Sequence, residues 1–97
     1  MQEAIELAYD SVKNYHGEPY GAVVVKDGAI VGSGTNIVGA TNDPTAHAEI
    51  EAVREACKRL NTTDLSDCVI YASGEPCPMC LGAIYWAGIQ TVYYAYA

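Results

Sequence analysis

The sequence predicts an α/β fold with three layers, α/β/α, in which helices cover both faces of a mixed sheet. Three observations lead to this prediction. An Asp-Gly pair joins two strand-like segments and predicts an N-terminal β-hairpin. Later strand-like segments alternate with segments of helical periodicity, and strands joined through helices run parallel with right-handed crossovers. The length of 97 residues and the apolar fraction of 51 % fit a single globular domain over residues 1–97.

The first part of the chain is expected to form a helix followed by the hairpin. Residues 2–15 carry apolar side chains at helical spacing and therefore predict a helix. Residues 20–26 contain the run Gly-Ala-Val-Val-Val, which is rich in β-branched residues and too uniformly apolar for a half-exposed strand, so they predict a central strand. Asp27-Gly28 suits a type I′ turn, because both residues of that turn need a positive φ. Residues 29–36 are therefore expected to return antiparallel to the central strand.

The second part is expected to alternate helices with strands. After a turn at residues 38–43, Asp43-Pro44 supplies an N-cap and a proline at the first helical position, which predicts a helix from there to about residue 60. The remaining elements are a strand, a helix stopped by glycine and a last strand, at residues 67–73, 76–87 and 91–96. Open sheets bind ligands beyond the carboxyl ends of their strands, where the helices predicted from residues 43 and 76 begin.

Charge and hydropathy argue against several classes of partner. The formal net charge is -7, from 12 acidic and 5 basic residues. Binding to a polyanion needs clustered Lys and Arg, so we expect a small-molecule substrate and no nucleic acid, unless an oligomer brings Arg54, Lys58 and Arg59 of two subunits together. No secretory leader is evident, and no apolar run approaches the roughly 20 residues that span a bilayer. We therefore expect a cytoplasmic protein without a membrane partner.

Two short motifs fall at the two helix starts: His47-Ala48-Glu49 and Pro76-Cys77-Pro78-Met79-Cys80. A C-x-x-C pair at a helix N-terminus directs both sulfurs at one ion, and the helix dipole favours the thiolate. Two thiolates and the His47 imidazole suit Zn2+. Three protein ligands leave one position for water, which is typical of a catalytic and not a structural zinc site. Glu49, two residues from a ligand, is the candidate for moving protons.

These residues also admit other interpretations. A C-x-x-C pair on its own suits a structural zinc half-site or a thioredoxin-like redox pair. Residues i and i+2 of a helix point about 200° apart, which separates His47 from Glu49 unless the two lie at the helix end. Cys57 and Cys68 fit core positions better than ligand positions, and His16 fits an exposed loop.

Three stretches carry a resemblance to a known family: residues 19–28, 42–49 and 75–86, which read PYGAVVVKDG, NDPTAHAE and EPCPMCLGAIYW. H-x-E followed by P-C-x-x-C is the signature of zinc-dependent nucleobase deaminases. From residue 19 to residue 94 the sequence resembles the cytidine deaminase superfamily and, within it, most closely the bacterial guanine deaminases. The last stretch favours guanine, because tRNA adenosine deaminases and cytosine deaminases share the first two with small changes.

The resemblance implies a cytidine deaminase-like fold and a hydrolytic deaminase. Its zinc ligands would be His47, Cys77 and Cys80. Zinc-bound hydroxide would attack the amino-bearing ring carbon of a nucleobase, and Glu49 would shuttle protons to the ring nitrogen and to the departing ammonia. For guanine the product would be xanthine. The alternatives are a tRNA adenosine deaminase, a cytosine or cytidine deaminase, and a catalytically impaired module that keeps its zinc for assembly.

The resemblance also implies substrate contacts, most of which have a structural alternative. Asn36 would hydrogen-bond the base, or cap a turn. The backbone of Ala48 would face the substrate. Tyr20 would line the pocket, or belong to the core. Trp86 would lie near the pocket, or pack against a neighbouring subunit.

The end of the sequence departs from the family pattern. Family members continue beyond the last strand with a C-terminal segment that closes the active site, so the resemblance implies a domain truncated at its C-terminus. The pocket would then be open, or a partner chain would complete it, or the sequence would be a fragment of a longer protein. The tyrosine-rich last strand would leave an apolar edge, from which we expect a homo-oligomer, a dimer or higher.

Overall fold

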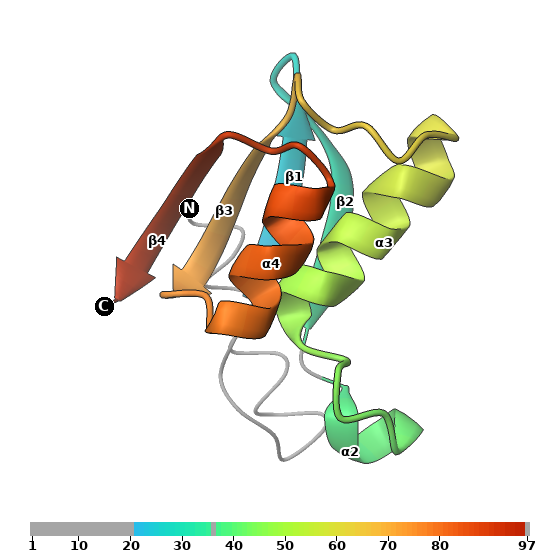
Figure 1. The fold of residues 1–97 in the computed structure, drawn as a ribbon, viewed down its shortest axis with the longest axis vertical. Coiled ribbons are helices and arrows are strands. Elements are labelled where there is room, and N and C mark those ends of the chain that lie inside the picture. Colours follow the sequence, from blue (N-terminus) through green and yellow to red (C-terminus); the bar gives the residue numbers. More distant parts are fainter. Residues whose placement is uncertain (1–20, 36, 97) are drawn as a thin grey trace.

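The computed structural model of the chain describes residues 21–35 and 37–96. The helix predicted at residues 2–15 lies outside them. Four strands and three helices follow one another in the described residues (Figure 1): β1 (Gly21–Lys26), β2 (Ala29–Thr35), α2 (Val38–Thr41), α3 (Ala48–Leu60), β3 (Val69–Gly74), α4 (Pro78–Trp86) and β4 (Thr91–Tyr96). No helix among these is long and apolar enough to cross a membrane.

The strands form one mixed sheet in the order β2-β1-β3-β4. β1 is antiparallel to both of its neighbours, and β3 and β4 are parallel. β2 and β3 therefore run in the same direction, and their carboxyl ends lie at the same edge of the sheet (Figure 1). This arrangement confirms the predicted mixed α/β sheet with strands joined through helices. It also brings the starts of α3 and α4 to that edge.

The β1–β2 hairpin has the turn that the sequence predicts. Asp27 and Gly28 have φ values of 52° and 78°, the positive values that a type I′ turn requires. The register shifts between Val24 and Val25, which pair with Gly32 and Ile30, so Val31 is the extra residue of a β-bulge in β2 just after the turn.

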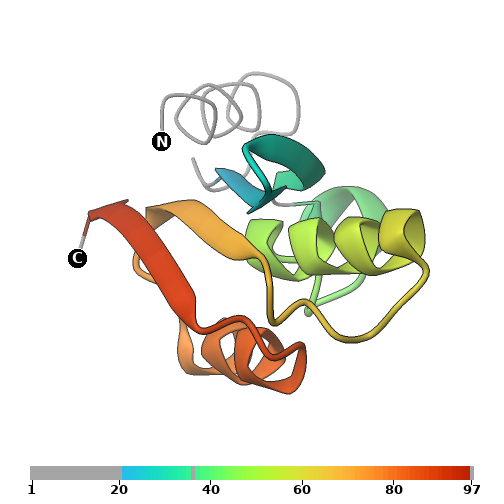
Figure 2. The same ribbon diagram turned by 90° about the horizontal axis from the view of Figure 1, so that it is seen from above.

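Helices α3 and α4 lie on the same face of the sheet (Figures 1 and 2), and α3 packs against β2, β1 and α4. The helix expected on the opposite face is the one at residues 2–15, outside the described residues. Apolar side chains from the sheet and both helices fill the space between the layers. The buried members of this core are Ala22, Val24, Ala48, Ala52, Ala56, Leu65, Cys68, Ile70, Ala72, Ile84, Ala87 and Ile89. Cys68 thus takes the core position expected of it, and Cys57 packs against the same core.

Glycine in β2 allows α3 to approach the sheet closely. A Cβ at Gly34 would overlap the carbonyl oxygen of Ala48, and a Cβ at Gly32 would overlap that of Ala52. Since real Cβ atoms do not approach backbone atoms so closely, any larger residue at these positions would push α3 away from the sheet. Gly34 therefore helps to place the first turn of α3.

The predicted start of the second helix is wrong. The helix begins at Ala48 with His47 as its N-cap, and not at Asp43-Pro44, while residues 38–41 form the short helix α2 in place of a turn. The Asp43 side chain accepts hydrogen bonds from the backbone N–H and the hydroxyl of Thr45 and closes a local turn. His47 then has extended backbone angles, φ -74° and ψ 157°, which separate this turn from the helix.

Candidate metal centre

The three predicted donor side chains come from the first residues of two helices. His47 is the N-cap of α3, and Cys77 is the N-cap of α4, where Pro78 follows at the first helical position. Cys80 lies in the first turn of α4. Because His47 has an extended backbone and Glu49 is already helical, the 200° separation expected within a helix (roughly, from 3.6 residues per turn) does not apply to this pair.

The donor atoms form a nearly equilateral triangle. His47 Nδ1 lies 3.5 Å from Cys80 Sγ and 3.7 Å from Cys77 Sγ, and the two sulfurs are 3.6 Å apart. Tetrahedral zinc, with Zn–S near 2.3 Å and Zn–N near 2.0–2.1 Å, requires about 3.8 Å between two sulfurs and about 3.6 Å between sulfur and nitrogen. These three side chains therefore fit a zinc ion with almost no rearrangement, and together they can hold a metal ion.

Glu49 is the buried carboxylic acid beside this triangle. Its side chain belongs to a residue that is only 8 % exposed. Burial raises the pKa of the carboxyl, although a backbone hydrogen bond, the charge of His47 and a hydrogen bond from Cys80 act in the opposite direction. Glu49 also lines a cavity of about 160 Å³ together with His47, Glu75 and Cys77. The carboxyl therefore shares one cavity with two of the three donor residues, His47 and Cys77.

The Cys80 thiol shows what a cation would change at this site. Burial, followed by the negative charge of Glu49, raises the pKa of the Cys80 thiol in the protein alone. A metal ion binds the thiolate and not the thiol, so a bound divalent cation favours the deprotonated form. The donor set is therefore matched to a cation that balances the charge of two sulfurs and one carboxylate.

The structure brings some of the predicted substrate contacts to this centre and not others. Ala48 lies fully buried between His47 and Glu49 at the first position of α3. Trp86 is the last residue of α4, at the opposite end of the helix from Cys77, and it is 86 % exposed. The structure does not bring Trp86 to the cavity. Asn36 and Tyr20 lie outside the described residues, so their roles stay predictions.

Glu75 is a cavity residue that the sequence did not single out. It is exposed, follows directly after β3, and lines the same cavity as Glu49. Its position immediately before Pro76-Cys77, at the carboxyl end of a strand, is the feature that would have pointed to it, because open sheets place ligands there. The cavity thus carries two carboxyl groups, one buried and one exposed.

An imidazole and two thiolates around one position, with a buried carboxylic acid that is no ligand, form the arrangement of zinc-dependent deaminases. Residues 1–96 match the family described as the cytidine and deoxycytidylate deaminase zinc-binding region, and the chain belongs to that family. It is a zinc-binding deaminase domain, which confirms zinc as the predicted cofactor.

Relatives of known structure and name support this assignment. The guanine deaminase of Bacillus subtilis (strain 168) is 56 % identical over 95 residues, which are 98 % of this chain and 61 % of that protein. The X-ray structure of guanine deaminase from Bacillus subtilis superposes with a TM-score of 0.94, over 98 % of this chain and 60 % of that one. The tRNA-specific adenosine deaminase of Aquifex aeolicus (strain VF5) is 46 % identical over 77 residues, 79 % of this chain and 51 % of that protein.

These comparisons confirm the predicted fold class and the predicted resemblance to guanine deaminases. The chain spans 61 % of the length of the first of these two curated relatives and 51 % of the second.

Proposed function

We propose that this domain catalyses the hydrolytic deamination of guanine to xanthine and ammonia, with zinc held by His47, Cys77 and Cys80. The observation that carries the proposal is the donor triangle, with sides of 3.5, 3.6 and 3.7 Å, beside a buried Glu49. A structural zinc site would need a fourth protein ligand and would have no use for a carboxylic acid that points into a cavity.

Glu49 is the residue that moves the proton. His47, Cys77 and Cys80 would hold the zinc ion, which when bound would lower the pKa of a coordinated water molecule to about 7. Glu49 would take a proton from the attacking water and give it to a ring nitrogen of the base. It would then take the second proton from the hydroxyl now bonded to the ring carbon and pass it to the amino group, which leaves as ammonia as that oxygen becomes a carbonyl. Burial raises the pKa of this carboxyl, which suits an acid that must hold a proton during the reaction. Guanine and water are thereby converted to xanthine and ammonia, and Glu49 is regenerated.

Two further observations support a free base over a nucleic acid. The identity to the Bacillus subtilis guanine deaminase, 56 %, exceeds the 46 % to the Aquifex aeolicus tRNA-specific adenosine deaminase. In the described part of the chain, Lys26, Arg54 and Arg59 lie 3.2, 2.8 and 3.4 Å from carboxylate oxygens of neighbouring residues. Cations that are already paired release few counterions from a phosphate backbone, so these residues favour a small substrate.

Adenosine in tRNA is the second candidate substrate. A solved structure from a study of tRNA:A34 deaminases superposes with a TM-score of 0.91 at 39 % identity and covers 97 % of this chain and 72 % of that one. The zinc-site fold is therefore shared by enzymes of both substrate classes, and an assay must separate them.

The test incubates the zinc-loaded protein with guanine, cytosine, adenine and an anticodon stem-loop and measures ammonia. We expect release from guanine. Glu49→Gln is expected to keep one zinc per chain and to lower the rate by at least about 100-fold, since general acid–base catalysis contributes on this order. Ammonia release from the stem-loop alone would identify adenosine in tRNA, and not guanine, as the substrate. A rate unaffected by Glu49→Gln would contradict the proposed mechanism, and no release from any substrate would favour the zinc-stabilised assembly module.

A further inference from the structure

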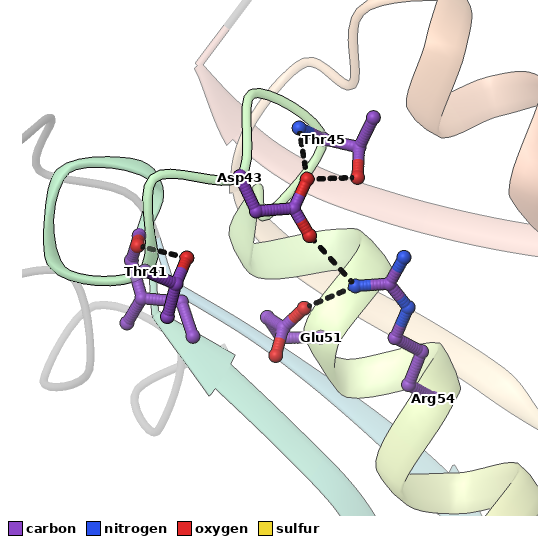
Figure 3. A network of polar contacts seen from close by, with 6 residues as sticks. Thr41, Asp43, Thr45, Glu51 and Arg54 are labelled. Atoms are coloured by element: carbon purple, nitrogen blue, oxygen red, sulfur yellow. Dashed lines mark hydrogen bonds and ion pairs between the residues drawn. The ribbon is translucent and has the colours of Figure 1, made fainter.

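The loop that leads into His47 is tied to α3 by a network of polar contacts (Figure 3). Oδ1 of Asp43 accepts hydrogen bonds from the Thr45 hydroxyl at 2.6 Å and from the Thr45 backbone N–H at 2.9 Å. Oδ2 of the same carboxylate lies 3.7 Å from Nη1 of Arg54, which donates a hydrogen bond to Glu51 at 2.8 Å. One carboxylate of Asp43 therefore connects the turn that precedes His47 with the second turn of the helix that follows it.

Backbone hydrogen bonds complete the attachment of His47. The N–H of His47 donates to the carbonyl of Thr45 at 2.8 Å, and the carbonyl of His47 accepts from the N–H of Glu51 at 3.0 Å. Ala46, one residue before His47, is buried, and its carbonyl accepts from the N–H of Ile37 at 3.0 Å. The backbone on both sides of His47 is thus held by partners within the loop and in α3.

His47 needs this support more than Cys77 does. Cys77 lies between Pro76 and Pro78, whose rings fix φ on both sides of it. His47 lies between two alanines, which leave the chain free to rotate, and its own angles are not those of the helix. The position of Nδ1 relative to the two sulfurs therefore depends on the loop contacts, and metal–ligand distances in a well-formed site lie within about 0.2 Å of their standard values.

We propose that Asp43, Thr45 and Arg54 are positioning residues that hold the imidazole of His47 at the metal site and thereby set its affinity and geometry. The proposal rests on the zinc ligands proposed above. Hydrogen bonds from Thr45, with the charge of Arg54 contributing less, hold the pKa of the Asp43 carboxyl below its usual range, so the network is intact at neutral pH. Partners that orient a metal ligand contribute on the order of 10- to 100-fold to metal affinity.

The variants separate the hydrogen bonds between Asp43 and Thr45 from the ion pair between Asp43 and Arg54. Asp43→Ala removes all of its contacts. Asp43→Asn keeps an oxygen that accepts from Thr45 and removes the charge that faces Arg54. Thr45→Val removes one hydroxyl donor without a large change of shape, and Thr45→Ser restores it. Arg54→Met removes the charge and keeps the aliphatic stem that lies on α3.

Asp64→Ala is the matched control. Oδ1 of Asp64 accepts the backbone N–H of Ser66 at 2.9 Å, so the variant also removes an aspartate-closed turn from an exposed loop. This loop lies at the far end of α4, where the backbone N–H of Leu65 donates a hydrogen bond to the carbonyl of Ala87, and not beside His47. A loss that is common to Asp43→Ala and Asp64→Ala therefore reflects general stability, and a loss in Asp43→Ala alone reflects the metal site.

The measurement uses the metals themselves and no substrate. Zn2+ affinity is measured by competition with a chromophoric chelator. Co2+ replaces zinc for absorption spectroscopy, in which the visible bands report the tetrahedral geometry and the thiolate charge-transfer bands report the two sulfurs. We expect Asp43→Ala to weaken zinc binding by about 10-fold or more and to change the visible Co2+ bands, while the charge-transfer bands persist. Thr45→Ser and Asp64→Ala should match the parent protein, and Thr45→Val, Arg54→Met and Asp43→Asn should fall between.

The proposal would be overturned if Thr45→Val, Arg54→Met and any folded Asp43 variant bound zinc with the affinity of the parent protein and showed its Co2+ bands. An equal loss of affinity in Asp43→Ala and Asp64→Ala would overturn it as well. These outcomes differ from a failure of the proposed function. Absent ammonia release with normal Co2+ bands would reject guanine and leave the positioning role standing, whereas parent protein without thiolate charge-transfer bands would reject the ligands and the positioning role together.

Discussion

The Sγ of Cys80 lies 3.5 Å from Nδ1 of His47, although the two residues are 33 positions apart in the chain. The sheet brings them together, because β2 and β3 end at the same edge, where α3 and α4 begin. The donor triangle therefore belongs to the tertiary fold, and its stability and the stability of the fold are coupled.

Removal of the metal is expected to destabilise the domain. The three donors join the starts of α3 and α4, so a bound ion favours the folded state, in which the donors are already within 3.7 Å of one another. A zinc chelator should lower the melting temperature of the zinc-loaded protein by more than about 5 °C. For a domain of this size, such a shift corresponds to a loss of about 1 kcal/mol in the free energy of unfolding. His47→Ala should melt at one temperature with and without chelator. Equal melting of the parent protein in both conditions would contradict the coupling.

Replacement of Gly34 by alanine should displace the first turn of α3. The new Cβ would overlap the carbonyl oxygen of Ala48 and lie 2.8 Å from the backbone nitrogen of Ala52. Overpacking of this kind costs about 1–3 kcal/mol, so we expect a loss of this size in the free energy of unfolding by urea. Gly39→Ala is the control, because a Cβ at Gly39 meets nothing within 4 Å. Equal stability of the two variants would show that α3 does not need the close approach.

The ion pair of Lys26 with Asp67 should appear in a titration. Their charged atoms are 3.2 Å apart, and the hydrogen bond from Lys26 is the main cause that lowers the pKa of Asp67. A lowered pKa means that the pair stabilises the fold above the ordinary aspartate pKa of about 3.9 and that this contribution is lost as the pH falls through the lower, folded-state value. Lys26→Met should raise the pKa of Asp67 toward its ordinary value, as NMR titration of the carboxyl carbon can measure. An unchanged pKa would show that the pair does not form in solution.

The homo-oligomer expected from the sequence stays a prediction, and exposed aromatic side chains now locate a surface for it. Tyr85 and Trp86 at the end of α4 are 81 % and 86 % exposed, and Tyr93 and Tyr94 on β4 are about half exposed, at 50 % and 44 %. Successive residues of a strand point to opposite faces of the sheet, so Tyr93 and Tyr94 belong to different surfaces, and the prediction rests on Tyr85 and Trp86. Large exposed apolar side chains are typical of interfaces. We expect a dimer or higher oligomer by light scattering at micromolar concentration, and a smaller species for the Tyr85→Ser, Trp86→Ser double variant. A stable monomer of the parent protein would refute this prediction.

Local patterns predicted most of the elements because their causes are local. Asp27-Gly28 has only a few favourable conformations, and the φ values of the turn follow from them. Proline at the start and glycine after the end likewise predicted α4. The start of α3 was predicted wrongly, because an aspartate before a proline suits a helix cap and a local turn equally well. Contacts with Thr45 and Arg54 decide between them, and these depend on the folded loop.

The site was predictable in its chemistry and less so in its surroundings. Residue types and spacing pointed to His47, Glu49, Cys77 and Cys80. The structure groups the three donors and places Glu49 in the cavity that His47 and Cys77 also line. Glu75 follows directly after β3, a position that could have pointed to it. However, its place in the same cavity as Glu49 depends on the fold, which brings the end of β3 and the start of α3 to one edge of the sheet. The exposed position of Trp86, at the far end of α4, likewise follows from the direction in which the helix leaves the site.

The central claim is that one zinc ion is bound by the imidazole of His47 and the sulfurs of Cys77 and Cys80, with one position left for water. Zinc-edge X-ray absorption of the zinc-loaded protein tests it most directly. We predict one zinc per chain with two sulfur neighbours at about 2.3 Å and two nitrogen or oxygen neighbours at about 2.0–2.1 Å, and a loss of the nitrogen contribution in His47→Ala. Four sulfur neighbours, or a spectrum that His47→Ala leaves unchanged, would contradict the claim.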